Sequence, residues 1–553
     1  MHNSIQIYKC SKICQKDIYP LETNTFSAKI NDGMIPQRIY TKEHTLLCPK
    51  RACIRRYYIM TTFLIGLAIL LVGGFLYGKF VEGIFKPDDR QTPAVKYEDG
   101  VDYVPMSKFK NALINLLNIA GTGPIFGPIQ GILFGPIAFL TIPIGCVISG
   151  ATHDYLSGMM SLRQDGAQMP GIMKKFLGNK VYHLYNIFLC FLMLLVGAVF
   201  TYTPGDLFAG QIVGLQGVSI WTWVIYAVIL GYYLIATLFP IDKIIGRIYP
   251  IFGAILLISA VGVFGGIFVK GYELTNLDLS GGFSGLFNMY PMWEATGNTG
   301  AGTPFIPVFF VTVACGITSG FHSTQCTLIG RSVRSEKEGK FTFYWMMILE
   351  GLIAMIWAAA AMGIYNAGSV SGATAVVGEV ARDILGPVGG VIAILGVIVL
   401  PITSGDTALR SCRLMIADYL HIDQKAKKNR VMVTLAMFIP VIFILVYAKT
   451  NAEGFNILWR YFAWANQTIA VFAFAAISIY LSAKKGAPKF AYLVSLLPGT
   501  FYLFIISSFL LSQKIGFGLG LHTSYVIAGV IAAAYFIGII CAGKKYAAKQ
   551  TEE

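Results

Sequence analysis

The sequence has 553 residues, of which 55% are hydrophobic and only 13% are charged, and its formal net charge is +15 at pH 7. Soluble domains carry about 25% charged residues, so this composition excludes an ordinary soluble enzyme or binding domain. Long apolar runs recur along most of the chain, and many reach the roughly 20 residues that cross a hydrocarbon core as a helix. The composition therefore predicts an all-α, polytopic membrane protein.

The apolar runs predict thirteen membrane spans. Each is expected to be a helix, because a helix pairs all its backbone groups internally and can therefore cross the bilayer. In chain order they cover residues 60–84, 112–133, 135–157, 185–203, 220–239, 248–269, 303–322, 342–366, 386–404, 431–448, 461–482, 490–512 and 523–543. No loop between them is long enough for a soluble domain, so we expect the function to reside in the helical bundle.

Lysine and arginine are distributed unevenly between the two sides of this arrangement. Loops that alternate along the chain after Met60 hold 27 Lys and Arg on one side and 5 on the other. Because such residues are retained in the cytoplasm during insertion, the rich side is predicted to be cytoplasmic. A chain beginning at Met60 then has its N-terminus outside the cytoplasm and its C-terminus inside. The positive charge is a topology signal, and we expect no nucleic acid among the partners.

Residues 1–59 do not fit this distribution, because they carry ten Lys or Arg and four Asp or Glu on the side predicted to be poor in positive charge. They also lack the continuous apolar segment of a signal peptide. We interpret 1–59 as a non-native or disordered N-terminal extension and 60–553 as the transmembrane domain that carries the function. If mass spectrometry of the native protein showed an N-terminus upstream of Met60, the interpretation of these residues as non-native would be refuted.

An unusual stretch in the second predicted span reads NIAGTGPIFGPIQGILFGP and covers residues 118–136. In water, interior glycine and proline weaken a helix by roughly 1 and 3 kcal/mol, so their repeated use needs an explanation. Glycines four residues apart form a smooth face for close helix packing, which we favour for Gly127, Gly131 and Gly135. Before them, polar and small residues coincide with Pro124, and there we favour an unwound segment that binds substrate or an ion. These residues are Asn118, Gly121, Thr122 and Gly123.

Two further irregular stretches lie in later spans, where a broken helix is tolerated only if it lines a cavity or is buried in protein. ACGITSGFHSTQ covers residues 314–325, and LPITSGDTALRS covers residues 400–411. If 112–133 is the first core span, 314–325 falls in the sixth. Breaks in the first and sixth helices, which run in opposite directions, are typical of an inverted-repeat transporter. We therefore predict an inverted-repeat core of ten helices, with one extra helix before it and two after it.

Ionisable side chains near or within membrane spans are costly and are therefore functional candidates. Those found are His153, Asp154, His322, Glu350 and Asp406. A purely structural hydrogen bond is the alternative for each, and for Glu350 and Asp406 we weigh the two equally. His322 ranks highest, because a side chain that titrates at about pH 6.5 coincides with a predicted break. We predict that His322, supported by Gln325, exchanges protons, with His153 and Asp154 as a second candidate.

Thr403 and Ser404 are adjacent hydroxyls at the inner end of the eighth core span. Together with carbonyls freed near Ala120 and Gly123, they would offer the oxygen ligands that a hard cation such as sodium needs. The alternative is that both hydroxyls cap a helix end or bond back to a carbonyl of the preceding turn. We favour the structural alternative.

Enzyme signatures are missing from the sequence. There is no P-loop, no HExxH zinc motif, no CxxC pair and no histidine spacing for haem. The GTGPIFG run imitates a dinucleotide fingerprint, but no strand precedes it as that fingerprint requires. We expect a protein that is not an enzyme and that needs neither a cofactor nor a metal.

Several stretches together resemble the carbon starvation protein A (CstA) family of inner-membrane transporters. They read NIAGTGPIFGPIQGILFGP, GATHDYLSGMMSLR, CGITSGFHSTQCTLIGR, EGLIAMIWAAAAM and SGDTALRSCR. The similarity extends over essentially all of the chain after Met60, although long members of the family exceed this chain in length. The family is associated with peptide uptake during carbon limitation, and some members with pyruvate uptake coupled to protons. It is grouped with the proteins that share the leucine-transporter fold.

The resemblance implies a secondary-active importer of peptides that serves the response to starvation. Proton-coupled pyruvate uptake is the alternative, and a starvation sensor without transport is less favoured. The expected partners are a small-molecule substrate, a proton or sodium as coupling ion, and membrane lipid. Both substrates present a carboxylate, which the positive ends of half-helices at Gly121–Pro124 and Thr318–Gly320 could bind. Within the second segment, the expected substrate-binding residues are Thr318, Ser319 and Gly320.

Overall fold

The computed structural model describes residues 60–100, 102–215, 217–238, 242–278, 304–424, 426–451 and 453–552. Within these residues the chain is helical, with no β-strand and one isolated bridge between Met106 and Val333. Residues 1–59 lie outside the described part of the chain, so their interpretation as an extension stays a prediction.

The first half of the bundle contains the extra N-terminal helix and the first five predicted core spans. Its elements are α3 (Thr61–Ala68), η1 (Ile69–Gly73), α4 (Gly74–Phe85), α5 (Pro93–Lys96), α6 (Lys108–Ile119), α7 (Gly123–Gly131), η2 (Ile132–Phe134), α8 (Ala138–Gly145), η3 (Cys146–Gly150), α9 (Ala151–Arg163), α10 (Met169–Leu177), α11 (Asn179–Leu207), η4 (Phe208–Val213), α12 (Ile220–Leu238) and α13 (Asp242–Val269). Prolines stand in the first turns of α5, α7 and α10, where the missing N–H has no helical partner to lose.

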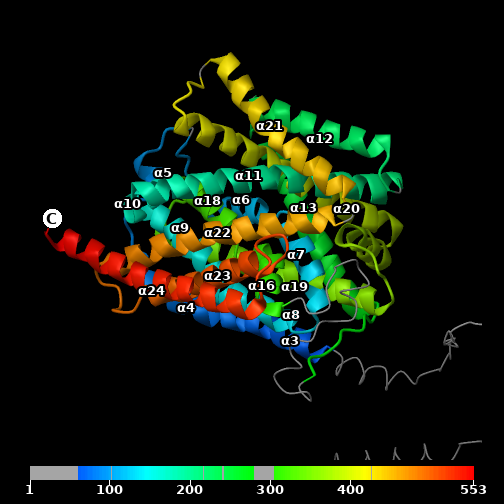
Figure 1. Ribbon diagram of the computed structural model, residues 1–553, viewed down its shortest axis with the longest axis horizontal. Coiled ribbons are helices and arrows are strands. Elements are labelled where there is room, and N and C mark those ends of the chain that lie inside the picture. The colour runs from blue at the N-terminus through cyan, green and yellow to red at the C-terminus, as the bar shows by residue number, and fades with distance from the viewer. Residues whose placement is uncertain are drawn as a thin grey trace, which may run out of the picture. The chain divides into compact units, whose positions relative to one another are not determined.

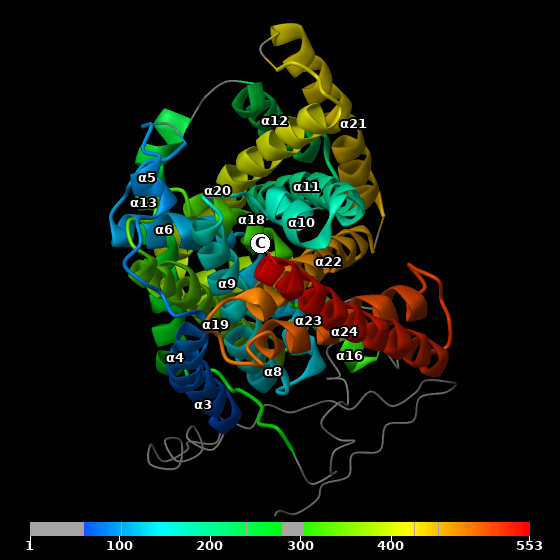
Figure 2. The same cartoon turned by 90° about the vertical axis from the view of Figure 1, so that its left-hand side faces the viewer.

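The second half contains the other five predicted core spans and two C-terminal helices. Its elements are α16 (Phe305–Thr312), α17 (Ala314–Ile317), α18 (Gly320–Ile329), η5 (Glu336–Glu338), η6 (Lys340–Tyr344), α19 (Trp345–Asn366), α20 (Ala373–Tyr419), α21 (Lys427–Thr450), α22 (Gly454–Ala483), α23 (Leu493–Ser512) and α24 (Leu521–Glu552). Figure 1 and Figure 2 show α11, α20 and α22 in one bundle, in which α11 contacts both of the others. α7 contacts α17, so the first break lies next to the second.

Helices cover all thirteen predicted spans, but they do not confirm thirteen crossings. In the described residues, nine helices are long and apolar enough to cross a membrane, or ten if α6 and α7–η2 count as one bent span. Two of the predicted spans that are not among these are 303–322, which is divided into α16, α17 and α18, and 135–157, which is continuous helix through α8, η3 and α9. The multi-pass, all-helical architecture is confirmed.

Contacts at the two ends of the bundle agree with the predicted alternation of loops. At the end predicted to be rich in Lys and Arg, Lys86 donates to the Gly486 carbonyl at 2.9 Å, and Arg163 pairs with Glu336 at 2.8 Å. These residues come from four loops or loop edges that the sequence assigns to that same side. At the other end, Asp383 accepts a hydrogen bond from Tyr272 at 2.6 Å, and both residues lie in loops assigned to the opposite side.

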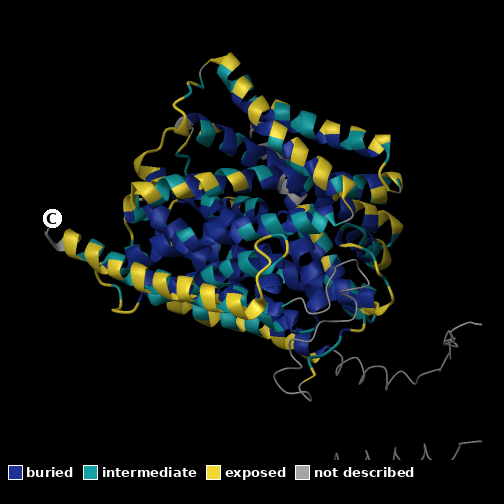
Figure 3. Cartoon of the chain, in the orientation of Figure 1, coloured by how far each residue is buried: buried dark blue, intermediate teal, exposed yellow. Residues whose placement is uncertain are grey.

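Burial distinguishes the centre of the bundle from its periphery. In the most apolar window of α22, 89% of residues are buried, whereas the value for α24 is 17%. Figure 3 shows the same contrast, with α9 and the middle of α22 dark blue and α24 largely yellow. The exposed helices carry apolar side chains outward, as a helix in contact with lipid does. Polar residues on α9, α18, α19 and α22 therefore lie inside the protein.

The glycine face of α7 packs against α16 and α17, as predicted for two of its members. A Cβ at Gly131 would lie 2.3 Å from Cγ2 of Val313, and one at Gly127 would lie 3.2 Å from the Thr312 carbonyl oxygen. Gly135 has a different role from the one predicted. Its φ of +95° ends η2 in a backbone conformation that only glycine adopts easily, so it makes a turn and not a packing face.

The third predicted irregularity, at residues 400–411, is wrong. α20 continues as a helix through Pro401, and its one non-helical residue is Gly386, with φ of 71°. A proline disfavours the helical conformation of the residue before it. At Gly386–Pro387 that residue is a glycine, which can move to positive φ, whereas Leu400 before Pro401 cannot do so at low cost and stays helical.

Candidate functional site

The first predicted break lies between α6 and α7. α6 ends at Ile119, α7 begins at Gly123, and the two parts of the span meet at 48°. A proline excludes the carbonyl four residues earlier from helical hydrogen bonding. For Pro124 this carbonyl belongs to Ala120, whose φ and ψ of −80° and 59° are not helical. The buried hydroxyl of Thr122 has no hydrogen-bond partner among the described residues, so an unused polar group remains at the break.

The second predicted break separates α17 from α18. Thr318 and Ser319 are extended, with φ of −156° and −124°, and α18 starts at Gly320. Asn466 of α22 caps this half-helix, because its Oδ1 accepts from the Phe321 N–H at 2.8 Å and from the Ser319 hydroxyl at 3.0 Å. Such an acceptor satisfies N–H groups that a helix start leaves without partners. The positive end of α18 is therefore occupied by a neutral side chain.

Thr318 also connects the second break with two other helices. Its Oγ1 lies 2.7 Å from the Ser149 hydroxyl of η3 and 3.3 Å from the Tyr502 hydroxyl of α23. Ser149 and Tyr502 line a cavity of about 310 Å³ whose other lining residues are mostly apolar. Thr318 thus belongs to a buried hydroxyl cluster beside an apolar cavity.

A line of four ionisable side chains passes through the centre of the bundle, next to the second break. His153 Nδ1 lies 2.8 Å from Asp154 Oδ1, His322 Nδ1 lies 3.0 Å from Asp154 Oδ2, and His322 Nε2 lies 3.5 Å from Glu350 Oε2. All four side chains are at most 1% exposed. They come from α9, α18 and α19. We call His153, Asp154, His322 and Glu350 the buried relay.

The relay places one imidazole between two carboxylates. The contact of His322 with Asp154 has hydrogen-bond length, whereas the 3.5 Å to Glu350 exceeds it. Neither Glu350 oxygen has a hydrogen-bond donor among the described residues, and the same holds for Nε2 of His153. The arrangement can hold a proton on either side of His322.

The local sequence explains why these side chains face each other. α9 follows η3, a π-helical turn, and such turns are frequent at functional sites. His322 is the third residue of α18, so its position depends directly on the break before it. Phe474 of α22 lies edge-on to the His153 ring at 5.1 Å between centroids and covers it with an apolar surface.

The structure also places two other predicted residues, Gln325 and Asn118, and the contact of Gln325 differs from the expected one. Gln325 bonds to Thr324 at 3.3 Å and has no hydrogen bond to His322 among the described residues, so the partners of His322 are Asp154 and Glu350 instead. Asn118 is half-buried near the end of α6.

The two predicted cation ligands, Thr403 and Ser404, differ in their hydrogen bonds. The Thr403 hydroxyl donates to the Leu400 carbonyl at 2.9 Å, which is the structural alternative that the sequence suggested. The Ser404 hydroxyl is buried without a partner among the described residues.

The sequence did not single out Asn466, Ser149 or Tyr502. Asn466 lies in an apolar helix, where an amide has to find polar partners, and this was the available signal. The hydroxyls of Ser149 and Tyr502 gave no comparable signal, because serine and tyrosine are ordinary residues in membrane helices. Their role depends on contacts between segments that are far apart in the chain.

The fold and the two broken helices define the class of this protein: it is a multi-pass, all-helical membrane protein with interrupted helices in its centre. Among solved structures, a mutant of the manganese transporter from Eremococcus coleocola matches with a TM-score of 0.50 and 12% identity. The match covers 80% of this chain and 96% of the transporter. At this identity the likeness concerns the fold alone. In the described residues, no group of three or more His, Cys, Asp or Glu is arranged to hold a metal ion.

The sequence model of the carbon starvation protein CstA family matches residues 58–281, 286–387 and 365–508, and the chain belongs to this family. An uncharacterized membrane protein from Haemophilus influenzae is 41% identical over 346 residues, which are 56% of this chain and 92% of that protein.

Two transporters from Escherichia coli are more distant relatives. The peptide transporter CstA is 24% identical over 345 residues, and the pyruvate/proton symporter BtsT is 25% identical over 344 residues. Each alignment covers 52% of this chain, with 48% of the first and 47% of the second. The chain therefore matches about half the length of these curated relatives. The resemblance identified from the sequence motifs is confirmed.

Proposed function

We propose that this protein is a secondary-active importer of small nutrients that carry a carboxylate, and that protons drive it. Peptides are the first candidate substrates and pyruvate is the second. The observation that carries the proposal is the position of His322 between two buried carboxylates, on a half-helix that begins at a break. The relative named as a pyruvate/proton symporter supports the proton as coupling ion, and sodium remains the alternative.

Proton binding and helix position would be coupled through His322. A protonated His322 would compensate the charge of Asp154, 3.0 Å away, whereas a neutral His322 would leave this carboxylate with less compensation. Breaking a buried ion pair costs about 3–5 kcal/mol, so this change favours a different position of α18. Because α18 follows two extended residues, a small rotation at Ser319 changes the distance from His322 to α9 and to α19.

Substrate binding would act on the same half-helix. The N-terminus of α18 carries a partial positive charge that suits a carboxylate, and Asn466 occupies it in this structure. A substrate carboxylate that takes the place of Asn466 Oδ1 would release α18 from α22. The free α18 could then move His322 relative to Asp154, which links substrate binding to proton transfer. The N-terminus of α7 at Gly123 lies in the neighbouring core helix and is the second contact that we propose for the substrate.

Uptake into proteoliposomes tests this function. Labelled dipeptides, tripeptides and pyruvate are supplied with and without an inward proton gradient, in buffers with and without sodium. We expect accumulation of one of these substrates that follows the proton gradient. His322→Gln should stop uphill accumulation but permit exchange of labelled for unlabelled substrate. Unchanged accumulation in His322→Gln would make this residue a structural histidine, and absence of all uptake would favour the starvation sensor.

We also propose the bacterial inner membrane as the location, with the Lys- and Arg-rich end in the cytoplasm. This orientation is supported by the 27 to 5 distribution of positive residues and by the contacts among loops at each end. Cysteines introduced singly in the loop after Lys484 and in the loop after Lys514 should react from opposite sides with a membrane-impermeant maleimide.

A further inference from the structure

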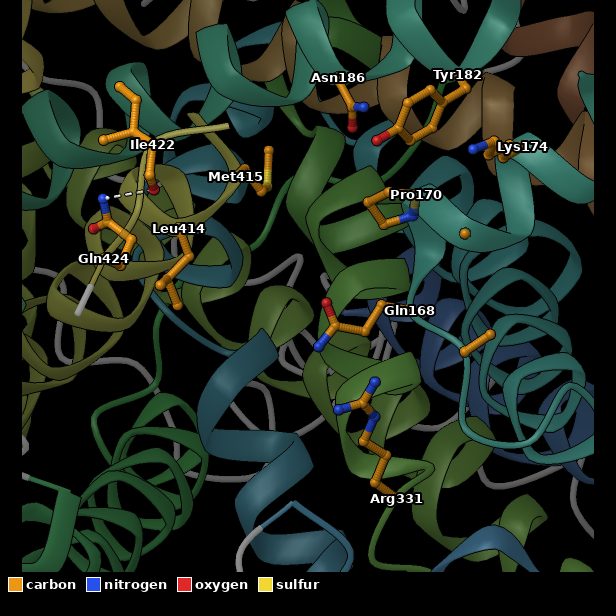
Figure 4. Close-up of a pocket in the computed structure, with 12 residues that line it drawn as sticks. Gln168, Pro170, Lys174, Tyr182, Asn186, Arg331, Leu414, Met415, Ile422 and Gln424 are labelled. Carbon is orange, nitrogen blue, oxygen red and sulfur yellow. Dashed lines mark hydrogen bonds between the residues drawn. The ribbon is translucent and has the colours of Figure 1, made fainter. Parts of the chain in front are cut away.

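A second cavity lies at the Lys- and Arg-rich end of the bundle, away from the buried relay. Its volume is about 670 Å³. Figure 4 shows the lining side chains in groups around an open centre, with Arg331 and Gln168 on one side and Leu414 and Gln424 across from them. Arg331 follows α18 by two residues, and Leu414 lies near the end of α20. We call this cavity the basic vestibule.

The lining residues that the structure describes include two cations, Lys174 and Arg331, and no Asp or Glu. Arg331 is held by a hydrogen bond from Nε to the Gly166 carbonyl at 2.9 Å and lies over the Tyr103 ring at 5.2 Å. Its terminal nitrogens have no hydrogen-bond partner among the described residues. The guanidinium is therefore fixed in place while its end groups remain free for an anion.

A third cation lies directly behind the wall of the vestibule. Arg413 is 6% exposed and donates to the side-chain oxygen of Gln424, which lines the cavity. Its Nε has no partner, and no carboxylate of the described residues forms an ion pair with it. A buried cation without a counter-ion is costly, and an anion in the vestibule would reduce this cost. Asn186, which is 8% exposed, adds an amide to the same lining.

The vestibule also lies between segments that an inverted-repeat transporter moves relative to one another. One wall follows α18, which carries His322, and the other belongs to α11 and α20, which pack extensively on each other. Rocking of one group of helices against the other alternately opens the two sides of such a fold. A cavity at this boundary is where a transported molecule would pass at the Lys- and Arg-rich end.

We infer that the basic vestibule binds the carboxylate of the transported molecule, with Arg331 and Lys174 as its direct contacts. This inference rests on the proposed function, because it names the same substrate class and adds a second site for it. An anionic lipid headgroup would present related chemistry, and the test below distinguishes it. Such a site explains why Arg331 and Lys174 line a cavity without carboxylate partners among the described residues.

Site-specific protection at Met415, a lining residue, measures occupancy of the vestibule directly. Met415→Cys in the full chain is reconstituted in nanodiscs of phosphatidylcholine, and maleimide labelling at position 415 is read by peptide mass spectrometry. Pyruvate and a dipeptide should slow the labelling, whereas pyruvamide should not. Arg331→Gln and Lys174→Gln should each raise the half-protective concentration by about tenfold, the usual value of one charge-assisted hydrogen bond.

Matched controls lie beside both residues. Arg334 and Lys175 carry the same charge within three positions of Arg331 and Lys174 but do not line the cavity. Arg334→Gln and Lys175→Gln should leave protection unchanged. Equal effects of all four substitutions, or no protection by either carboxylate, would overturn the inference.

The same assay separates the inference from the alternatives. Protection without added substrate in nanodiscs containing phosphatidylglycerol, with none by pyruvate or dipeptide, would assign the vestibule to a lipid headgroup and overturn the inference. Normal transport with unaltered protection in Arg331→Gln would overturn the vestibule site and leave the proposed function intact. Protection by carboxylates in a protein that moves none of them would instead contradict the proposed function and support the site.

Discussion

Substitution of Glu350 by glutamine tests the buried relay most directly. The amide has the shape of the carboxylate but cannot take up a proton from His322. Glu350 is fully buried on α19, its Oε2 lies 3.5 Å from His322 Nε2, and no donor bonds either oxygen among the described residues. Under the proposed function, the one imidazole between the two carboxylates would transfer one proton in each cycle. One pH unit across the membrane is worth about 1.4 kcal/mol per proton. When one proton enters with each substrate and the pair carries no net charge, this free energy sustains a roughly tenfold ratio of internal to external substrate.

The measurement is the ratio of internal to external substrate at steady state, with a gradient of one pH unit. We expect a ratio approaching tenfold for the unmodified protein and a ratio near one for Glu350→Gln, while exchange of labelled for unlabelled substrate continues. Glu82→Gln is the control, because Glu82 is partly exposed and pairs with Lys340 outside the relay. Accumulation by Glu350→Gln equal to that of the control would refute the role of Glu350 in coupling.

Three further outcomes are expected. Gly131→Ala should lower the melting temperature in detergent, because its Cβ would meet Cγ2 of Val313 at 2.3 Å and such overpacking costs about 1–3 kcal/mol; Val313→Ala in the same chain should recover part of the loss, and strictly additive effects would exclude this contact. Asn466→Ala should destabilise the protein by about 1–3 kcal/mol, because the cap of α18 is left without its acceptor, and Asn466→Asp, which keeps the acceptor, should destabilise it less. Arg90 holds the pKa of the half-exposed Asp88 well below its usual range. A pKa that is lowered in the folded state adds stability above the unfolded-state pKa, and this stability is lost as the pH falls, so the free energies of unfolding of Asp88→Asn and the parent should differ by less than about 1 kcal/mol at neutral pH and converge in acid. A difference that grows in acid would contradict this sign.

The sequence predicted both breaks because their causes are local. Pro124 follows Gly121 and Gly123 and cannot donate a helical hydrogen bond to the Ala120 carbonyl, and the Thr318–Ser319 pair precedes a glycine that begins the next half-helix. Pro401 gave the same signal but produced no break. A proline predicts that a helix is weakened, whereas the surrounding helices and the preceding residue decide whether it opens.

The partners across the bundle could not be predicted in the same way. His322 and Asp154 were both candidates, but their contact depends on the packing of α18 against α9. Glu350 was weighed equally as structural or functional, and only its distance to His322 connects it with the relay. The close contact of Gly123 with another helix is a further example of packing that the sequence does not reveal. A Cβ there would lie 2.0 Å from Cβ of Cys315, so Gly123→Leu disturbs helix packing and cannot by itself report on substrate binding.

The choice between proton and sodium as coupling ion can be argued from Thr403 and Ser404. A sodium site needs several oxygen atoms that are free of other bonds. The Thr403 hydroxyl already bonds to the Leu400 carbonyl at 2.9 Å, and α20 stays helical at Thr403 and Ser404, so no break in α20 frees carbonyls beside them. Of this pair, Ser404 offers a buried hydroxyl without a partner among the described residues.

We therefore expect that uptake continues in sodium-free buffer at constant pH and that Thr403→Ala lowers the rate by no more than about tenfold, the upper effect of one lost neutral hydrogen bond. Ser404→Ala serves as the matched variant, because it removes the one free hydroxyl without disturbing the bond made by Thr403. If removal of sodium abolished uptake and Ser404→Ala did the same with sodium present, the cation would bind here. The buried relay would then have to balance charge within the bundle without carrying the driving proton.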